Sequence, residues 1–365
     1  MLGANDIGGS QVKKARRQKL RWQPLVVSLG GPVIGVLIGL VIGGILILIA
    51  KADPIKSYAI LFSGAFGGPR QITETLLEAC PLMIIGLGMS AAFRARVWNI
   101  GAEGQYYMGA LLGGLVALYL PPFLPRVILI IVMMLAGLLG GALWGLIPAI
   151  FKIKNGVSEI ISTLMLNYIA ILLMQYLVRG PLQDPNGFLP TSAQFAPATN
   201  LPLLFGSRIH IGVVIGFLLA PVVFALLWST PLGFKLRAVG SRASVARYAG
   251  ARVERMIVFA MMFSGALAGL AGIIQVASVS NRLKASISVN YGFSGVLVAL
   301  LGRMNPFGVV IASLFFAALS IGVQSMHVIY QLPVDLASAI QAIIVLSVLA
   351  VDSLIRRRFP EWIGA

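Results

Sequence analysis

The chain has 365 residues, of which 58% are hydrophobic and only 11% are charged, and its mean hydropathy is +0.94. A soluble domain is usually about 45–50% apolar and about 25% charged, so the composition excludes a soluble globular protein and predicts a membrane protein. Lysine and arginine number 28 against 11 acidic residues. In so apolar a chain, the positive-inside rule explains this excess better than nucleic-acid binding does.

The first long apolar run, residues 25–50, follows a basic segment at residues 1–24. This order imitates a secretory signal peptide, but the apolar core of a signal peptide has only about 7–15 residues. We therefore expect an uncleaved first transmembrane helix. The single cysteine, Cys80, excludes an intrachain disulfide.

Ten apolar runs predict an all-α, polytopic transmembrane bundle. The predicted spans are 25–50, 74–93, 101–120, 126–150, 157–178, 210–229, 256–278, 290–302, 307–326 and 335–352. Most lysines and arginines fall on one side if both termini are cytoplasmic, which favours that orientation. The expected domains are a basic cytoplasmic tail (1–24), a transmembrane domain (25–355) with a cytoplasmic loop at 230–255, and a cytoplasmic C-terminal tail (356–365).

Two of the predicted spans are short or broken. The span 290–302 would cover only about 20 Å of a core about 30 Å thick, and it ends at a helix break near Pro306. The polar segment 93–105 makes a second break. Interrupted spans in both halves of a chain are typical of transporters built from repeats around a transport path.

Glycines recur every four residues in two of the predicted spans. The first set is Gly31, Gly35, Gly39 and Gly43, and the second is Gly137, Gly141 and Gly145. This small-xxx-small pattern predicts close helix packing. Packing within the chain is favoured over a dimer contact.

The sequence has no phosphate-binding loop of the G-x-x-x-x-G-K-[ST] type and no G-x-S-x-G nucleophile motif. Its two histidines, His210 and His327, lie outside any metal-ligand spacing. We expect no catalytic residue, metal or cofactor in this chain, so any ATP would be hydrolysed by a partner subunit.

Polar side chains inside membrane spans are costly and often functional. The candidates for a substrate path are Asn99, Glu103, Gln105, Asn167, Tyr168, Gln275 and Gln324. Hydrogen bonding between helices is the alternative role for the amides. Glu103 is equally compatible with capping a helix start.

The loop 230–255 contains a predicted short helix, Arg242–Ala249, with Ser241 as its cap and Gly250 at its end. This helix either lies on anionic lipid or docks on an ATPase subunit. The candidate coupling residues are Gly233, Arg237, Gly240, Ser241, Arg242, Arg247, Tyr248 and Gly250.

Four stretches (91–105, 155–168, 232–250 and 264–272) resemble the membrane permeases of bacterial ATP-binding-cassette importers for nucleosides and simple sugars. These permeases are related to the ribose and branched-chain amino-acid permeases. The chain differs from their pattern at Arg96, where glycine is usual, and at 240–243, where a Gly-x-Asn-Pro-like turn is usual.

The resemblance implies a heterodimer with a second homologous permease chain, an ATPase with tandem nucleotide-binding domains, and an extracytoplasmic substrate-binding lipoprotein. It also implies a location in the inner membrane, and it favours the coupling interpretation of the short helix. We favour a nucleoside over a sugar as the substrate. The alternative function is an ion-coupled secondary transporter, for which Glu78, Glu103 or Glu159 would be the intramembrane acid.

Overall fold

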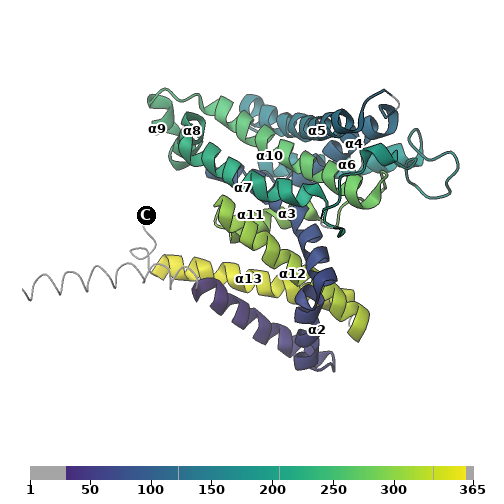
Figure 1. Cartoon of the computed structure of the whole chain (residues 1–365). Coiled ribbons are helices and arrows are strands. Elements are labelled where there is room, and N and C mark those ends of the chain that lie inside the picture. The colour runs from purple at the N-terminus through teal and green to yellow at the C-terminus, as the bar shows by residue number, and fades with distance from the viewer. Residues whose placement is uncertain (1–29, 122, 205, 332, 359–365) are drawn as a thin grey trace, which may run out of the picture. The chain divides into compact units, whose positions relative to one another are not determined.

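The computed structural model describes residues 30–121, 123–204, 206–331 and 333–358 (Figure 1). Eight of its helices are long and apolar enough to cross a membrane. Within the described ranges, extended pairing is limited to the isolated bridges Thr191–Lys284 and Leu203–His210. The predicted all-α membrane bundle is confirmed, while the predicted tail 1–24 lies outside the described residues.

Most helices follow one another with short connections, but the segment 180–210 is a long connection whose only described helix is a three-residue 3-10 helix. In chain order they are Gly30–Ile49, α2 (Pro54–Phe66), α3 (Pro69–Arg94), α4 (Ala102–Tyr119), α5 (Arg126–Asn155), α6 (Glu159–Arg179), η1 (Pro197–Thr199), α7 (Ile211–Ser229), α8 (Pro231–Ser241), α9 (Ala243–Tyr248), α10 (Val253–Gln275), η2 (Val276–Ser280), α11 (Tyr291–Leu301), α12 (Pro306–Tyr330) and α13 (Val334–Arg358).

The chain forms two compact units, Met1–Gly64 with Gly322–Ala365, and Ala65–Ile321. In the first unit, the glycine-rich helix Gly30–Ile49 packs on α13. A Cβ on Gly35 would lie 2.5 Å from the Cα of Val348, and a Cβ on Gly39 would lie 2.6 Å from the Cα of Ile344. The predicted packing of this glycine face within the chain is confirmed.

The helix α2 was not predicted, because charged residues interrupt the apolar pattern before it. The Asp53 carboxylate accepts hydrogen bonds from the backbone N–H groups of Ile55 (2.9 Å) and Lys56 (3.3 Å). Such caps stabilise a helix start. The Tyr58 hydroxyl then donates to the carbonyl of Leu40 at 2.5 Å, which ties α2 to the preceding helix.

In the second unit, α10 lies at the centre of the packing and contacts α3, α4 and α5 (Figure 1). The second glycine set lies on its contact with α5. A Cβ on Gly137 would overlap the side chain of Ile273, and one on Gly145 would lie 2.8 Å from the carbonyl oxygen of Met261. This set also packs within the chain, as predicted.

Both predicted breaks are present. Residues 95–101 are non-helical between α3 and α4, and α11 has only 11 residues before the turn that leads into α12. Several helix ends differ from the predicted ones: α3 begins at Pro69, α5 continues to Asn155, and α13 continues through residues 356–358, which the sequence places in the predicted tail.

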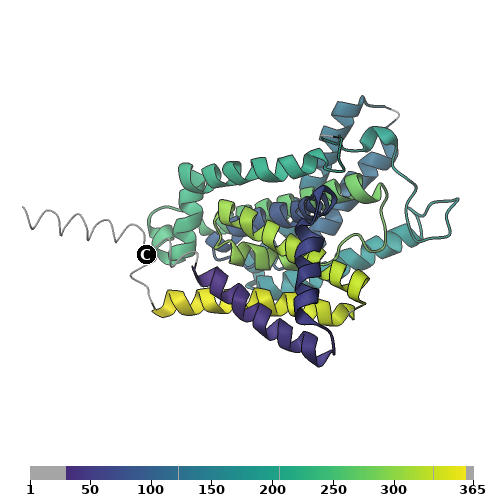
Figure 2. The same ribbon diagram turned by 60° about the horizontal axis from the view of Figure 1, so that its bottom comes forward.

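The connections of the second unit meet in two groups. Arg208 pairs with Glu74 at 2.5 Å, joining two segments predicted to lie outside. Lys152 pairs with Glu159 across the connection between α5 and α6, which is predicted to be cytoplasmic. Figure 2 shows α8 and α9 together at one end of this unit, beyond the end of α7. Segments predicted to share a membrane side are therefore close to one another.

Candidate functional site

The N-termini of two helices, α4 and α11, meet inside the second unit. A Cβ on Gly292 in α11 would overlap the backbone nitrogen of Glu103 in α4, so only glycine permits this approach. The Glu103 carboxylate accepts a hydrogen bond from the backbone N–H of Gly292 at 2.7 Å. Glu103 therefore caps the neighbouring helix α11, where the positive end of the helix dipole favours a carboxylate.

Asn99 lies at the centre of the broken segment before α4 and is fully buried. Its Nδ2 donates to Gln105 Oε1 at 2.8 Å and to Ser264 Oγ at 3.0 Å. Its Oδ1 accepts from the backbone N–H of Gly101 and from Gln105 Nε2, both at 3.1 Å. These bonds join the break to α4 and to α10.

Asn167 in α6 holds the break from the other side. Its Oδ1 accepts from the backbone N–H of Gly104 at 2.8 Å, and its Nδ2 donates to the carbonyl of Ile100 at 2.9 Å. Irregular backbone at membrane depth is tolerated only where such partners satisfy its polar groups. The two asparagines supply partners for the N–H groups of Gly101 and Gly104 and for the carbonyl of Ile100.

The structure thus brings together four of the seven predicted path residues: Asn99, Glu103, Gln105 and Asn167. All four are buried and hydrogen-bonded, so they fix the position of two helix N-termini. In transporters with broken helices, such N-termini lie near the transport path.

The other three predicted residues lie apart from this network. Tyr168 is 58% exposed on α6. Gln324 is exposed on α12. The Oε1 of Gln275 is buried without a hydrogen-bond partner among the described residues.

Sequence reasoning missed two participants. Ser264 stands in a run of small residues that reads as packing, yet its hydroxyl accepts from Asn99. Tyr291, at the start of α11, donates to the Glu78 carboxylate at 2.8 Å and so ties α11 to α3. Its position as the first residue of a short apolar helix was the available signal.

The predicted coupling helix differs in its start. Ser241 ends α8, and Arg242 stands at the N-cap of α9 without a side-chain cap bond, so the predicted Ser241 cap is wrong. The cap is instead at the start of α8, where Thr230 Oγ1 accepts from the backbone N–H of Gly233 at 3.1 Å. Gly250 follows α9 with φ of +82°, so the predicted glycine end is confirmed.

Two of the predicted coupling glycines have a packing role. A Cβ on Gly240 would overlap the carbonyl oxygen of Arg94, and one on Gly233 would overlap the carbonyl oxygen of Leu226. These glycines let α8 approach the ends of α3 and α7.

The short helix α9 exposes nearly all of its surface. Only Ala246 is buried (3% exposed), against the cluster of Val239, Ala251 and Val253. Tyr248 is 95% exposed. The other residues of this helix are exposed.

The surface of α9 also carries an ion pair to the next helix. Arg247 pairs with Glu254 of α10 at 2.5 Å, and both side chains are largely exposed. Exposed pairs of this kind contribute little to stability. Arg247 is therefore available for a role outside the fold.

Metal-binding clusters are absent from the described ranges. His210 is buried at the start of α7, and neither of its ring nitrogens has a hydrogen-bond partner in the part of the chain that the structure describes.

Comparison with known proteins gives one family. Residues 71–349 match the family described as branched-chain amino acid transport system / permease component. The chain is 35% identical to the glucose ABC transporter permease protein TsgB13 of Haloferax volcanii, over 89% of this chain and 88% of the relative. No solved structure matches the chain.

Two further relatives are bacterial. The guanosine ABC transporter permease protein NupP of Bacillus subtilis is 32% identical over 87% of this chain and 92% of its own length. The nucleoside ABC transporter permease protein NupB of Lactococcus lactis is 31% identical over 81% and 84%. The chain belongs to the branched-chain amino acid transport system / permease component family and is the membrane permease subunit of an ABC transporter.

Proposed function

We propose that this chain forms the transport path of a nucleoside importer, with a simple sugar as the second substrate class. As an ABC permease, the chain works with ATPase and substrate-binding subunits. We further propose that the chain forms a heterodimer with a second homologous permease and lies in the inner membrane. Its ATPase would have tandem nucleotide-binding domains, and its substrate-binding subunit would be an extracytoplasmic lipoprotein. Two relatives, the guanosine permease NupP and the nucleoside permease NupB, favour the nucleoside, and the glucose permease TsgB13 favours the sugar.

The exposed surface of α9 carries the coupling part of the proposal. This helix follows the predicted cytoplasmic end of α7 and α8 and is anchored by Ala246 alone. Tyrosine and arginine are among the residue types enriched at the energetically dominant positions of protein interfaces. Tyr248 and Arg247 offer such a contact to the ATPase.

The paired N-termini of α4 and α11 carry the transport part. Their contact at Gly292 and Glu103 needs both helices in place, so a shift of α10 or α11 would move this junction. The network of Asn99 and Asn167 links the junction to α6 and α10. Movement driven at α9 reaches this junction through α10, which begins at Val253, five residues after α9 ends.

An intramembrane acid for ion coupling is not needed in this account. Glu103 caps α11, Glu78 accepts from Tyr291, and Glu159 pairs with Lys152. Each candidate acid of the secondary-transport alternative therefore has a structural partner, and family membership favours ATP-driven import.

A charge swap tests the coupling role. We expect Arg247→Glu to abolish ATP-dependent uptake and copurification of the ATPase, while membrane insertion stays normal. The double variant Arg247→Glu with Glu254→Arg restores the ion pair within the chain but presents the opposite charge to a partner.

If Arg247 binds the ATPase, uptake stays lost in the double variant. Recovery of uptake in the double variant would show that only the internal pair matters, and would contradict docking through Arg247. Arg252→Glu, at an exposed arginine between α9 and α10, serves as the matched control for added negative charge.

A further inference from the structure

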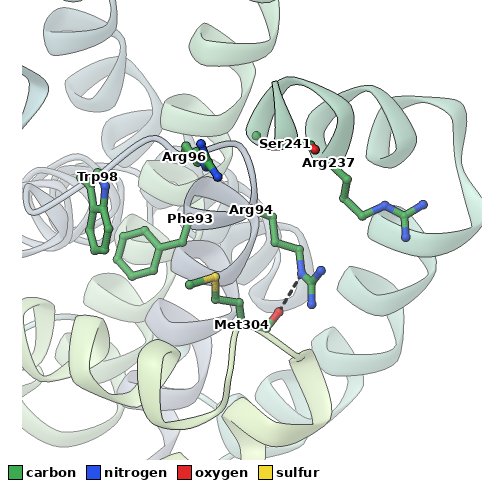
Figure 3. Close-up of a pocket in the computed structure, with 8 residues that line it drawn as sticks. Phe93, Arg94, Arg96, Trp98, Arg237, Ser241 and Met304 are labelled. Atoms are coloured by element: carbon green, nitrogen blue, oxygen red, sulfur yellow. Dashed lines mark hydrogen bonds between the residues drawn. The ribbon is translucent and has the colours of Figure 1, made fainter. Parts of the chain in front are cut away.

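A pocket lies beside α8 at the predicted cytoplasmic end of the second unit (Figure 3). Its volume is about 410 Å³. Three segments that are distant in sequence form it: the break after α3, the end of α8, and the turn between α11 and α12. Its lining residues are Phe93, Arg94, Arg96, Trp98, Arg237, Gly240, Ser241 and Met304.

The pocket is positively charged without internal compensation. In the described ranges, no carboxylate lies within 4.0 Å of the Arg94, Arg96 or Arg237 side-chain nitrogens. The guanidinium groups of Arg94 and Arg237 both lie over the ring of Trp228, at 4.3 Å and 5.7 Å from its centroid. Three like charges around one cavity repel one another, and a bound anion would remove that cost.

The geometry of Arg94 is fixed by the protein. Arg94 Nε donates to the carbonyl of Met304 at 3.1 Å, and Figure 3 shows this side chain directed toward Met304. This bond and the contact with Trp228 hold the guanidinium in place. A guanidinium held in one orientation is suited to planar, bidentate recognition of phosphate.

The backbone around the pocket is strained. Arg96, Arg303 and Met304 have φ values of +53°, +56° and +54°. These values lie in the left-handed region, which residues other than Gly and Asn rarely adopt. Arg96 and Arg303 take this conformation as the residues that end α3 and α11, where the backbone N–H groups of Val97 and Met304 donate to the carbonyls of Ala92 and Ala299. At Arg96 and Met304, strained residues line the cavity itself.

The pocket also has an aromatic wall. Trp98 is 42% exposed, and its ring lies 4.9 Å from that of Phe93. In Figure 3 these two rings lie on the side of the pocket opposite Arg237. A volume of about 410 Å³ falls in the range of small-molecule sites, about 300–1,000 Å³. The pocket therefore has room for an anion that carries an organic group.

We propose that this pocket binds a phosphate ester, with the phosphate at Arg94, Arg96 and Arg237 and the organic group against Trp98. Two sources share this chemistry, a soluble nucleotide of the cytoplasm and the headgroup of an anionic phospholipid. A nucleotide would stack its base on Trp98, while a phospholipid would place its glycerol there. The pocket contains three of the predicted coupling residues, Arg237, Gly240 and Ser241, but none of α9, so its occupant would act beside the proposed ATPase contact at α9.

The test uses the full-length chain in complex with its ATPase in phosphatidylcholine nanodiscs. Calorimetric titrations with adenosine monophosphate, adenosine and inorganic phosphate test the soluble source. Native mass spectrometry of the complex in nanodiscs that also contain phosphatidylglycerol tests the lipid source. We expect one phosphate ester to bind and adenosine not to bind.

Variants separate binding from folding. Arg96→Gly removes a charge and also relieves the left-handed backbone, so it should fold at least as well as the parent chain. We expect Arg96→Gly and Arg237→Gln each to weaken binding by about tenfold or more, as for the loss of one charge-assisted hydrogen bond. Arg252→Gln, outside the pocket, should leave binding unchanged.

Three outcomes would overturn the proposal. The first is that neither adenosine monophosphate nor phosphatidylglycerol binds in a manner sensitive to Arg96→Gly and Arg237→Gln. The second is that inorganic phosphate binds as tightly as the ester. The third is binding to the free chain that disappears in the complex, which would assign the pocket to an acidic side chain of the ATPase.

Discussion

Gly141 of α5 and Gly265 of α10 face each other so closely that a Cβ on either one would overlap the carbonyl oxygen of the other. The two helix backbones are thus in direct contact at the centre of the second unit. We expect Gly141→Ala and Gly265→Ala each to destabilise the chain by about 1–3 kcal/mol, the usual cost of overpacking. Thermal unfolding in detergent measures this effect.

The matched control is Gly30→Ala, since a Cβ on Gly30 would meet nothing within 4 Å. This change should leave the melting temperature unchanged or raise it slightly, because alanine favours a helix over glycine. Equal melting temperatures for Gly141→Ala and the parent chain would contradict the close contact.

Asn99 should matter for stability through the groups that it satisfies. Asn99→Leu leaves the side chain of Gln105 and the N–H of Gly101 without their buried partner. We expect a loss of about 2–4 kcal/mol, since each buried unsatisfied polar group costs about 1–3 kcal/mol. Asn155→Leu, at an exposed asparagine, is the control; similar melting temperatures for the two variants would show that the network is dispensable.

Glu103 distinguishes a capping role from ion coupling. Glu103→Gln keeps an oxygen that can accept from Gly292, whereas Glu103→Ala does not. We expect uptake to survive in Glu103→Gln and to fall with expression in Glu103→Ala. Uptake abolished equally in both variants, with normal insertion, would instead indicate that the charge itself is required.

The cap of α8 provides a test of the coupling segment. Thr230→Ala removes the bond to Gly233 and should destabilise the start of α8 by about 1 kcal/mol. Ser241→Ala removes no cap and should have no such effect. Hydrogen exchange of the first amides of α8 and of α9 reports the difference, and faster exchange of the first α9 amides in Ser241→Ala would restore the predicted Ser241 cap.

The fold was largely predictable because apolar runs and glycine spacing act locally. Gly35 and Gly39 carry a pattern that needs a close neighbour, and the structure supplies α13. The helix α2 was missed because Asp53, Lys56 and the proline between them interrupt hydropathy, although the same residues start a helix.

The sequence predicted several polar residues of the site, but not how they are arranged. Asn99, Gln105 and Asn167 were recognisable as costly polar groups, but their partners depend on tertiary packing. The pocket around Arg96 joins three connections far apart in sequence. Arg237 was predicted only as a coupling residue and Arg96 only as a departure from the permease pattern, because their common place in one cavity depends on tertiary packing.

Transport in a reconstituted system tests the central claim most directly. The chain, its partner permease and the ATPase are placed in proteoliposomes with the binding protein, and uptake of a radiolabelled nucleoside is measured with and without ATP on the ATPase side. The account predicts uptake that requires ATP, is insensitive to an uncoupler, and is lost in Arg247→Glu. Uptake that persists without ATP and collapses with an uncoupler would contradict it.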